Sequence, residues 1–154
     1  MKVMATLNVN GTDYPVEIDP HLSLLKAVRD EIGLTGSKEG CDDSECGACM
    51  MLLNGKPVNS CSYLALQAEG KSVTTVEGLS PDTELGPLQL AFLQNGGVQC
   101  GFCTPGMLVS ATALLRANPA PSEAETRIAL AGNLCRCTGY DGIVRAVRSV
   151  AKNG

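Results

Sequence analysis

The sequence is poor in aromatic residues and in histidine. Of its 154 residues only 3% are Phe, Tyr or Trp, no Trp is present, and His21 is the single histidine. Proteins that bind single-stranded nucleic acid stack its bases on aromatic rings, and this chain has few rings to offer. A net charge of −4 also disfavours binding to a phosphate backbone. We therefore expect no nucleic-acid partner, and we expect His21 to be a surface or helix-capping residue.

Long hydrophobic runs are missing as well. No apolar stretch approaches the roughly 20 residues that a helix needs to span a bilayer. Residues 1–10 lack the charged and apolar regions of a secretory signal and contain no twin arginine. We expect no membrane insertion and a cytoplasmic location. Thiols stay reduced in the cytoplasm, so cysteines here are expected to bind metal and not to form disulfides.

Cysteine, by contrast, is abundant, and it falls into two sets of four. The first set is Cys41, Cys46, Cys49 and Cys61, and the second is Cys100, Cys103, Cys135 and Cys137. The opening C-x4-C-x2-C spacing is that of plant-type ferredoxin loops, in which thiolates hold a 2Fe–2S cluster. Glycines at 40, 47 and 101 would let backbone N–H groups approach the sulfurs. Two such sets in one short chain predict an electron-carrying protein.

Zinc is the alternative metal, because thiolates also suit zinc. Structural zinc sites usually combine two C-x2-4-C pairs. The second cysteine set resembles a distorted form of this pattern. However, Cys135 and Cys137 are separated by the single residue Arg136, which is a shorter spacing than a usual zinc knuckle has. A zinc-structured adaptor therefore stays as an alternative hypothesis.

Hydrophobic periodicity divides the chain near residue 77. The first half predicts strands over 3–9, 14–18, 50–53, 58–64 and 72–76, with Asn-Gly turns at 10–11 and 54–55. Ser23 is predicted to cap a helix that Gly33 ends. A hairpin, a helix, a long loop and further strands are typical of a β-grasp, the plant-type ferredoxin architecture.

The second half predicts helices. Their expected starts are Asp82, Thr104-Pro105 and the capping box Ser122-x-x-Glu125, and a last helix carries Tyr140 and Val147. Four short amphipathic helices predict a four-helix bundle. The predicted fold class is thus α+β, with a β-grasp domain over residues 1–77 and a helical domain over residues 78–154. Residues 78–87 are the expected linker.

Four runs around the cysteines resemble the xanthine oxidase family of molybdenum hydroxylases. They are KEGC at 38–41, CGAC at 46–49, QCGFCTPG at 99–106 and GNLCRCTGY at 132–140. More narrowly, the chain resembles the separate small iron–sulfur subunit of bacterial members. The resemblance covers nearly the whole chain, and all eight cysteines match.

The resemblance implies two 2Fe–2S clusters. The first half would hold an outer cluster through Cys41, Cys46, Cys49 and Cys61. The second half would hold an inner cluster through Cys100, Cys103, Cys135 and Cys137. The inner cluster would lie beside the pterin of a molybdenum cofactor in a large partner subunit, with Gln99 and Cys137 against that pterin.

The implied function is electron transfer without substrate chemistry on this chain. Electrons would pass from the large molybdopterin-binding subunit to a medium subunit with FAD or to an external acceptor, and such complexes can dimerise. A free-standing two-cluster ferredoxin is a further hypothesis. The acidic residues Glu39, Asp42, Asp43 and Glu45 are either a solvated surface or a docking face for a redox partner. The chain departs from the family at Ser44, where many members have Gly, and at Met50-Met51, where many have Thr-Val.

Overall fold

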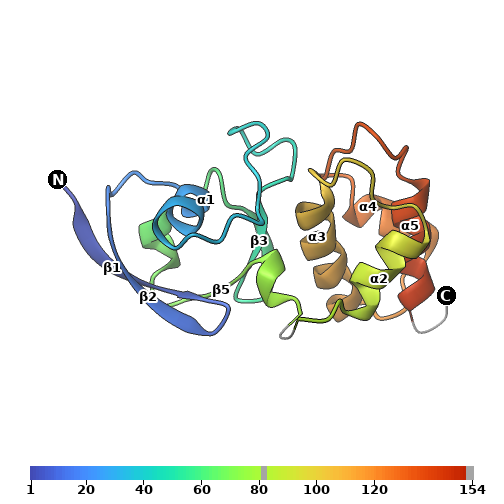
Figure 1. Ribbon diagram of the computed structural model, residues 1–154, viewed down its shortest axis with the longest axis horizontal. Helices are drawn as coiled ribbons and strands as arrows, with labels where there is room; N and C mark the ends of the chain where they lie inside the picture. Colours follow the sequence, from blue (N-terminus) through green and yellow to red (C-terminus); the bar gives the residue numbers. More distant parts are fainter. Residues whose placement is uncertain (81–82, 152–154) are drawn as a thin grey trace.

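The computed structural model describes residues 1–80 and 83–151. Figure 1 shows two halves beside each other, the N-terminal one built mainly of strands and the C-terminal one of helices. A mixed sheet together with helices confirms the predicted α+β class. Asp82, the predicted start of the first C-terminal helix, lies outside the described residues.

The N-terminal half contains one five-stranded sheet. Its strands are β1 (Val3–Val9), β2 (Thr12–Ile18), β3 (Met50–Leu53), β4 (Lys56–Asn59) and β5 (Ser72–Thr74). They lie in the order β2-β1-β5-β3-β4, with β1 and β5 parallel and the other neighbours antiparallel. This arrangement agrees with a ferredoxin-like β-grasp.

Both predicted Asn-Gly turns are present. Asn10 and Gly11 have φ of 53° and 81°, and Asn54 and Gly55 have φ of 49° and 79°. Two successive residues with positive φ make the type I′ turn whose twist suits a hairpin. These turns fix the register of β1 with β2 and of β3 with β4.

The predicted N-terminal helix is shorter and less regular than expected. It consists of α1 (Leu24–Lys26), which continues as a π-helical turn over Ala27–Glu31. The Ser23 hydroxyl accepts the Lys26 N–H at 3.3 Å, as an N-cap should. Gly33 follows with φ of 86°. The helix covers one face of the sheet, and the core between them includes Leu7, Ile18, Leu24, Leu25, Val28 and Met51.

Two strands end earlier than predicted, and β2 and β4 each begin two residues earlier than predicted. A strand over 58–64 was expected, but β4 ends at Asn59 and the chain turns. The buried Ser60 hydroxyl donates to the Cys49 carbonyl at 2.6 Å, which holds this turn against the first cysteine loop. The last strand was expected to reach Val76, but β5 ends at Thr74, and Val76–Gly78 form a 3-10 turn.

The C-terminal half contains α2 (Pro87–Gln94), α3 (Thr104–Ala117), α4 (Glu123–Ala129) and α5 (Asp141–Val150). A second core lies among them and includes Phe92, Met107, Leu108, Ile143 and Val147. The Ser122–Glu125 capping box is present. Helix α2 begins at Pro87 with Gly86 as N-cap, so Leu85 lies outside the helix that was expected to contain it.

The two halves are in contact. Helix α3 packs against β3, and the two cysteine-bearing loop regions lie at the same edge of the molecule, at the top of Figure 1. Among the residues that the structure describes, no helix has the length and apolar character required to cross a membrane.

Candidate metal centres

The first cysteine loop directs backbone N–H groups at its own sulfurs. The Cys46 N–H donates to the Cys41 Sγ at 3.4 Å, and the Ala48 N–H donates to the Cys46 Sγ at 3.5 Å. Positive φ at Asp42, Ser44 and Gly47 (70°, 68° and 72°) bends the backbone into this loop. Amide donors of this kind stabilise negative charge on sulfur, as a thiolate-bound cluster requires.

Gly40 leaves room that a side chain would fill. A Cβ at this position would lie 2.8 Å from the Cys46 Sγ and 3.4 Å from a ring carbon of Phe102. Real Cβ atoms do not approach sulfur so closely, so the loop adopts this shape only with Gly at 40. The absence of a side chain at Gly40 therefore leaves the space beside the Cys46 sulfur open.

Cys49 and Cys61 complete the first set from inside the fold. Both are buried, and their thiols are neighbours. Burial raises the pKa of the Cys49 thiol to about 11, and the adjacent Cys61 thiol contributes to the same shift. Cys61 also acts electrostatically on Cys46, whose own pKa is raised, chiefly by burial. The pair Cys41–Cys46 and the pair Cys49–Cys61 thus belong to one site.

The second set forms two further pairs at the open end of the helical half. The sulfurs of Cys100 and Cys137 lie 3.5 Å apart, and both residues are exposed. Cys103 and Cys135 are also neighbours, and burial raises the pKa of Cys103 to about 12.

Cys135 has the strongest set of hydrogen-bond donors in the second set. The Thr138 hydroxyl lies 3.0 Å from its sulfur, and the Thr138 N–H donates to the same sulfur at 3.4 Å. Partial burial acts to raise the pKa of Cys135, yet these hydrogen bonds hold it below its ordinary value. The Cys135 N–H donates to the Tyr140 hydroxyl at 2.9 Å, which fixes the loop from behind.

The eight sulfurs therefore fall into four pairs, two in each site. A 2Fe–2S cluster with four cysteines takes two thiolates on each iron, and a paired donor set suits it. Structural zinc instead takes four ligands around one ion. Within residues 1–80 and 83–151 the sulfurs are gathered as pairs, and no group of three or more His, Cys, Asp or Glu side chains could hold a metal ion of any kind. The donor chemistry thus fits two 2Fe–2S clusters better than zinc.

The two sites are joined directly through the backbone. The Leu134 N–H donates to the Cys46 carbonyl at 2.9 Å, and Leu134 precedes Cys135 in the chain. A single hydrogen bond therefore links a cysteine of the first set to the neighbour of a cysteine of the second. Electron transfer between the sites would have a short, bonded route.

The surface around the second site is open and partly apolar. Gln99, Cys100 and Cys137 are exposed, and the side chains of Phe102 and Leu134 are 48% and 56% exposed. Tyr140, which follows Leu134 in the same loop, is half-buried. His21 is exposed and pairs with Asp19, as a surface residue would.

Ser44 contacts the segment that carries Cys61. Its hydroxyl pairs with the Ser62 hydroxyl, and its carbonyl accepts the Asn59 side-chain N–H at 3.1 Å. Ser62, Asn59, Asn133 and Thr138 were not singled out from the sequence. Asn133 and Thr138 stand in the run at 132–140 that carries the family resemblance, whereas the only signal for Asn59 and Ser62 is that each is a polar residue near a cysteine.

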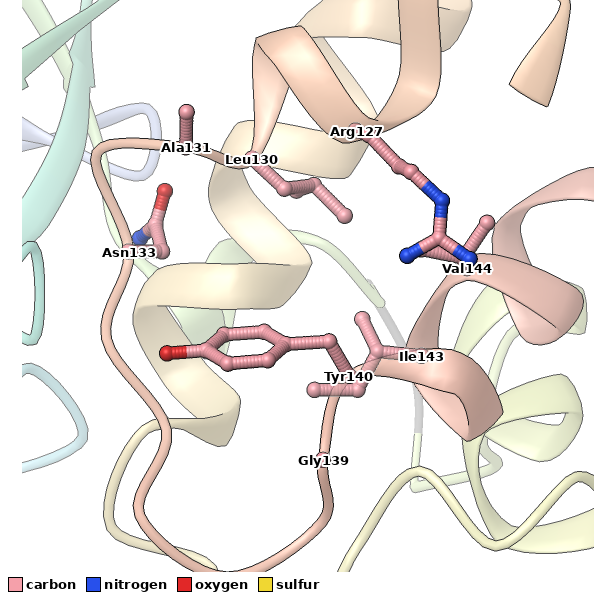
Figure 2. A pocket seen from close by; sticks show the side chains of 8 residues that line it. All are labelled: Arg127, Leu130, Ala131, Asn133, Gly139, Tyr140, Ile143 and Val144. Atoms are coloured by element: carbon pink, nitrogen blue, oxygen red, sulfur yellow. The ribbon is translucent and has the colours of Figure 1, made fainter. Parts of the chain in front are cut away.

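A cavity of about 250 Å³ lies between α4 and α5, and its lining residues include no cysteine. Figure 2 shows Tyr140 along one side of it and Arg127 on the other. The remaining lining residues are Leu130, Ala131, Asn133, Gly139, Ile143 and Val144. Arg127 already pairs with Glu123 and Asp141, both at 2.9 Å, so its charge is compensated. This cavity has no group suited to redox chemistry.

Comparison with protein families gives two adjacent matches. Residues 7–77 match a 2Fe-2S iron-sulfur cluster binding domain, and residues 75–148 match a 2Fe-2S binding domain. Each cysteine set lies within one of these matches.

Individual proteins match over nearly the whole chain. The small FeS subunit of nicotinate dehydrogenase from Eubacterium barkeri is 48% identical over 147 residues, which cover 96% of this chain and 94% of that subunit. Quinoline 2-oxidoreductase from Pseudomonas putida 86 superposes with a TM-score of 0.94 at 45% identity, covering 97% of this chain and 93% of that chain. The aldehyde oxidoreductase of Desulfovibrio desulfuricans superposes with a TM-score of 0.92 at 44% identity, over 96% of this chain but 17% of that longer chain.

Proposed function

The chain belongs to the iron–sulfur subunits of the xanthine oxidase family of molybdenum hydroxylases, and we propose that it carries electrons between a molybdopterin-binding large subunit and a final acceptor. It is an electron-transfer subunit of an oxidoreductase. The observation that carries the proposal is the grouping of eight reduced thiols into two sites, each with two sulfur pairs.

We assign four ligands to each site. Cys41, Cys46, Cys49 and Cys61 would hold the outer cluster, and Cys100, Cys103, Cys135 and Cys137 the inner one. When bound, each 2Fe–2S cluster supplies a centre that takes up and releases electrons. We further propose a domain boundary between residues 77 and 78, with α2 to α5 as a bundle, and the two separate hydrophobic cores support this division.

The protein's own residues tune and insulate these sites. The N–H groups of Cys46, Ala48 and Thr138 face sulfur and favour the negative charge that reduction adds. Burial of Cys49 and Cys61 keeps water from one side of the first site. The Leu134–Cys46 hydrogen bond holds the two loops in contact.

The exposed second site supports a partner over a free-standing ferredoxin. A ferredoxin acting alone would shield both clusters, but Cys100 and Cys137 are at the surface with Phe102 and Leu134 beside them. We propose that the large subunit covers this face and brings its molybdenum–pterin cofactor against Gln99 and Cys137. The length of the aldehyde oxidoreductase chain, of which this chain spans 17%, is in keeping with a larger partner.

The outer site would face the acceptor. Asp42, Asp43 and Glu45 lie on its loop and are exposed, which suits docking of a positively charged surface. We propose a medium subunit with FAD, or an external acceptor, in this place, and a complex that can dimerise. We also propose the cytoplasm as the compartment, since thiols stay reduced there and can serve as ligands.

Metal analysis of natively purified protein tests the assignment. We expect two irons and two sulfides for each cysteine set, with two distinguishable EPR signals after dithionite reduction. Stoichiometric zinc in place of iron would overturn the proposal in favour of a zinc-structured adaptor.

Single ligand substitutions test the order of the two sites in the complex. We expect Cys46→Ser to lose the outer cluster and electron delivery to the acceptor, while substrate still reduces molybdenum. Cys103→Ser should interrupt electron flow at its start, because it removes an inner ligand. Failure of substrate to reduce molybdenum in the Cys46 variant would show that the order is wrong.

A further inference from the structure

Asn133 is a buried polar residue at the junction between the two cysteine sites. It is 3% exposed and lies between α4 and Cys135. Its Nδ2 donates to the Gly47 carbonyl at 3.1 Å, and its Oδ1 accepts the Ser110 hydroxyl at 2.8 Å. One side chain thus connects the first cysteine loop, the segment of the second set and helix α3.

The backbones around Asn133 approach each other because two glycines, Gly47 and Gly106, lack side chains. A Cβ on Gly47 would lie 2.4 Å from the Gly132 carbonyl oxygen, and a Cβ on Gly106 would lie 2.1 Å from the Gly47 carbonyl oxygen. Gly47 also has φ of 72°, which favours glycine. The first cysteine loop therefore touches both α3 and the second cysteine segment without intervening side chains.

The hydrogen bonds at this junction specify one relative position. Consecutive carbonyls, of Cys46 and Gly47, accept hydrogen bonds from the consecutive residues Leu134 and Asn133. Displacement of one loop would leave the Asn133 amide or the Ser110 hydroxyl buried without a partner, while the Gly47 carbonyl would keep only the Met50 N–H of its own loop. A fully satisfied buried network of this kind rigidifies the packing around it.

We propose that Asn133 is a positioning residue that fixes the separation of the two cysteine sites and thereby the rate of electron transfer between them. The proposal rests on the proposed function of the chain. In the step concerned, one electron leaves the inner site and enters the outer one, so the inner site is oxidised and the outer reduced. Asn133 exchanges no proton and forms no covalent bond. It acts only through the geometry of the loops that it joins.

Three variants of the full chain in its complex separate positioning from general stability. Asn133→Ala removes both side-chain hydrogen bonds, and Ser110→Ala removes only the donor to the Asn133 Oδ1. Asn95→Ala is the matched control, because the Asn95 Nδ2 bonds only within its own half, to the Ala91 carbonyl at 2.8 Å. Iron content, the EPR spectrum of the fully reduced protein and electron redistribution after flash photoreduction are measured for each.

We expect Asn133→Ala to retain the iron of both sites, to lose part of the magnetic splitting between the two reduced centres and to redistribute electrons more slowly. Ser110→Ala should show the same changes to a smaller extent, and Asn95→Ala should match the unmodified chain. If Asn133→Ala keeps all its iron and shows an unchanged magnetic splitting and an unchanged rate of electron redistribution, the positioning role of Asn133 is overturned. The proposed function of the chain is unaffected by that result. Loss of iron from Asn133→Ala but not from Asn95→Ala would also overturn the positioning role, because Asn133 would then support cluster binding. Absence of iron from the unmodified chain would overturn the proposed function first.

Discussion

Single residues with small side chains set the shape of the first cysteine loop. Gly40 leaves the space beside the Cys46 sulfur open, and Gly47 lets the loop rest on the second half. Ser44 occupies a left-handed conformation with φ of 68°. Its hydroxyl contact with Ser62 offsets part of the backbone strain and ties the loop to the turn that holds Cys61.

Substitution of Gly40 by Ala tests the role of this open space. The added Cβ would lie 2.8 Å from the Cys46 sulfur, so the loop has to move and its sulfur pair separates. We expect Gly40→Ala to lose the iron of the first site and to keep that of the second, as measured by metal analysis and EPR. Gly132→Ala is the control, because no atom lies within 4 Å of its Cβ position. Equal iron in the two variants would contradict this reading of Gly40.

At the scale of helices, α4 and α5 are held together by polar contacts at the surface. Arg127 of α4 binds Glu123 on its own helix and Asp141 of α5, both at 2.9 Å. Exposed ion pairs of this type contribute little, about 0–1 kcal/mol each. The capping box is the more specific device, since Ser122 and Glu125 satisfy each other's backbone N–H groups at 2.8 and 3.2 Å.

The capping box predicts a pH-dependent part of the stability. The Ser122 backbone N–H, and then its hydroxyl, lower the pKa of Glu125 below its usual 4.5. A lowered folded-state pKa means that this contribution is fully present above 4.5 and disappears as the pH falls through the folded-state value. We expect Glu125→Gln to be less stable than the unmodified chain at neutral pH and equally stable in acid, by urea unfolding. Glu17→Gln, at an exposed position of β2, is the control and should show no such difference.

Removal of the other half of the box also destabilises α4, and part of this effect depends on pH because the Ser122 hydroxyl helps to lower the pKa of Glu125. Ser122→Ala deletes the hydroxyl that accepts the Glu125 N–H, and loss of such a cap costs about 1 kcal/mol. We expect a lower urea midpoint with an unchanged slope at neutral pH. A midpoint equal to that of the unmodified chain would show that α4 is held by packing alone.

Local signals explain which elements the sequence predicted. Asn10-Gly11, Ser23 and the Ser122 box act through residues a few positions apart, so their turns and caps are visible in the chain. The strand predicted over 58–64 ends early because the Ser60 hydroxyl binds the distant Cys49 carbonyl. The π-helical turn over Ala27–Glu31 has no local signal that we identify.

The candidate sites show the same limit. Cysteine spacing predicted two sets of four, but the partners within each set depend on the folded chain. Cys137 pairs with Cys100, thirty-seven positions away, and not with its close neighbour Cys135. The hydrogen bond of Asn133 could not be predicted from the sequence either, because its partner Gly47 is eighty-six positions away.

For the whole molecule, the exposed second site predicts where assembly changes the protein. A partner that binds only the folded chain stabilises it and slows exchange at the surface that it covers. We expect residues 99–104 and 133–140 to gain protection from hydrogen exchange in the complex relative to the free chain, while the turn at 10–11 stays unchanged. Equal protection of both segments in the free chain would favour the free-standing ferredoxin. The free chain should also lose its inner cluster to oxygen faster than the complex.

The central position of β5 has a consequence for how the chain folds. β5 pairs in parallel with β1, and its residues Ser72 and Val73 lie opposite Asn8 and Val9, while β3 flanks it on the other side. The first cysteine loop and Cys61 are therefore synthesised before the sheet around them can close, which requires the chain to reach Thr74. Pairing across so long a stretch is slow to form. Four thiols are thus present on an incomplete scaffold until the chain reaches Thr74.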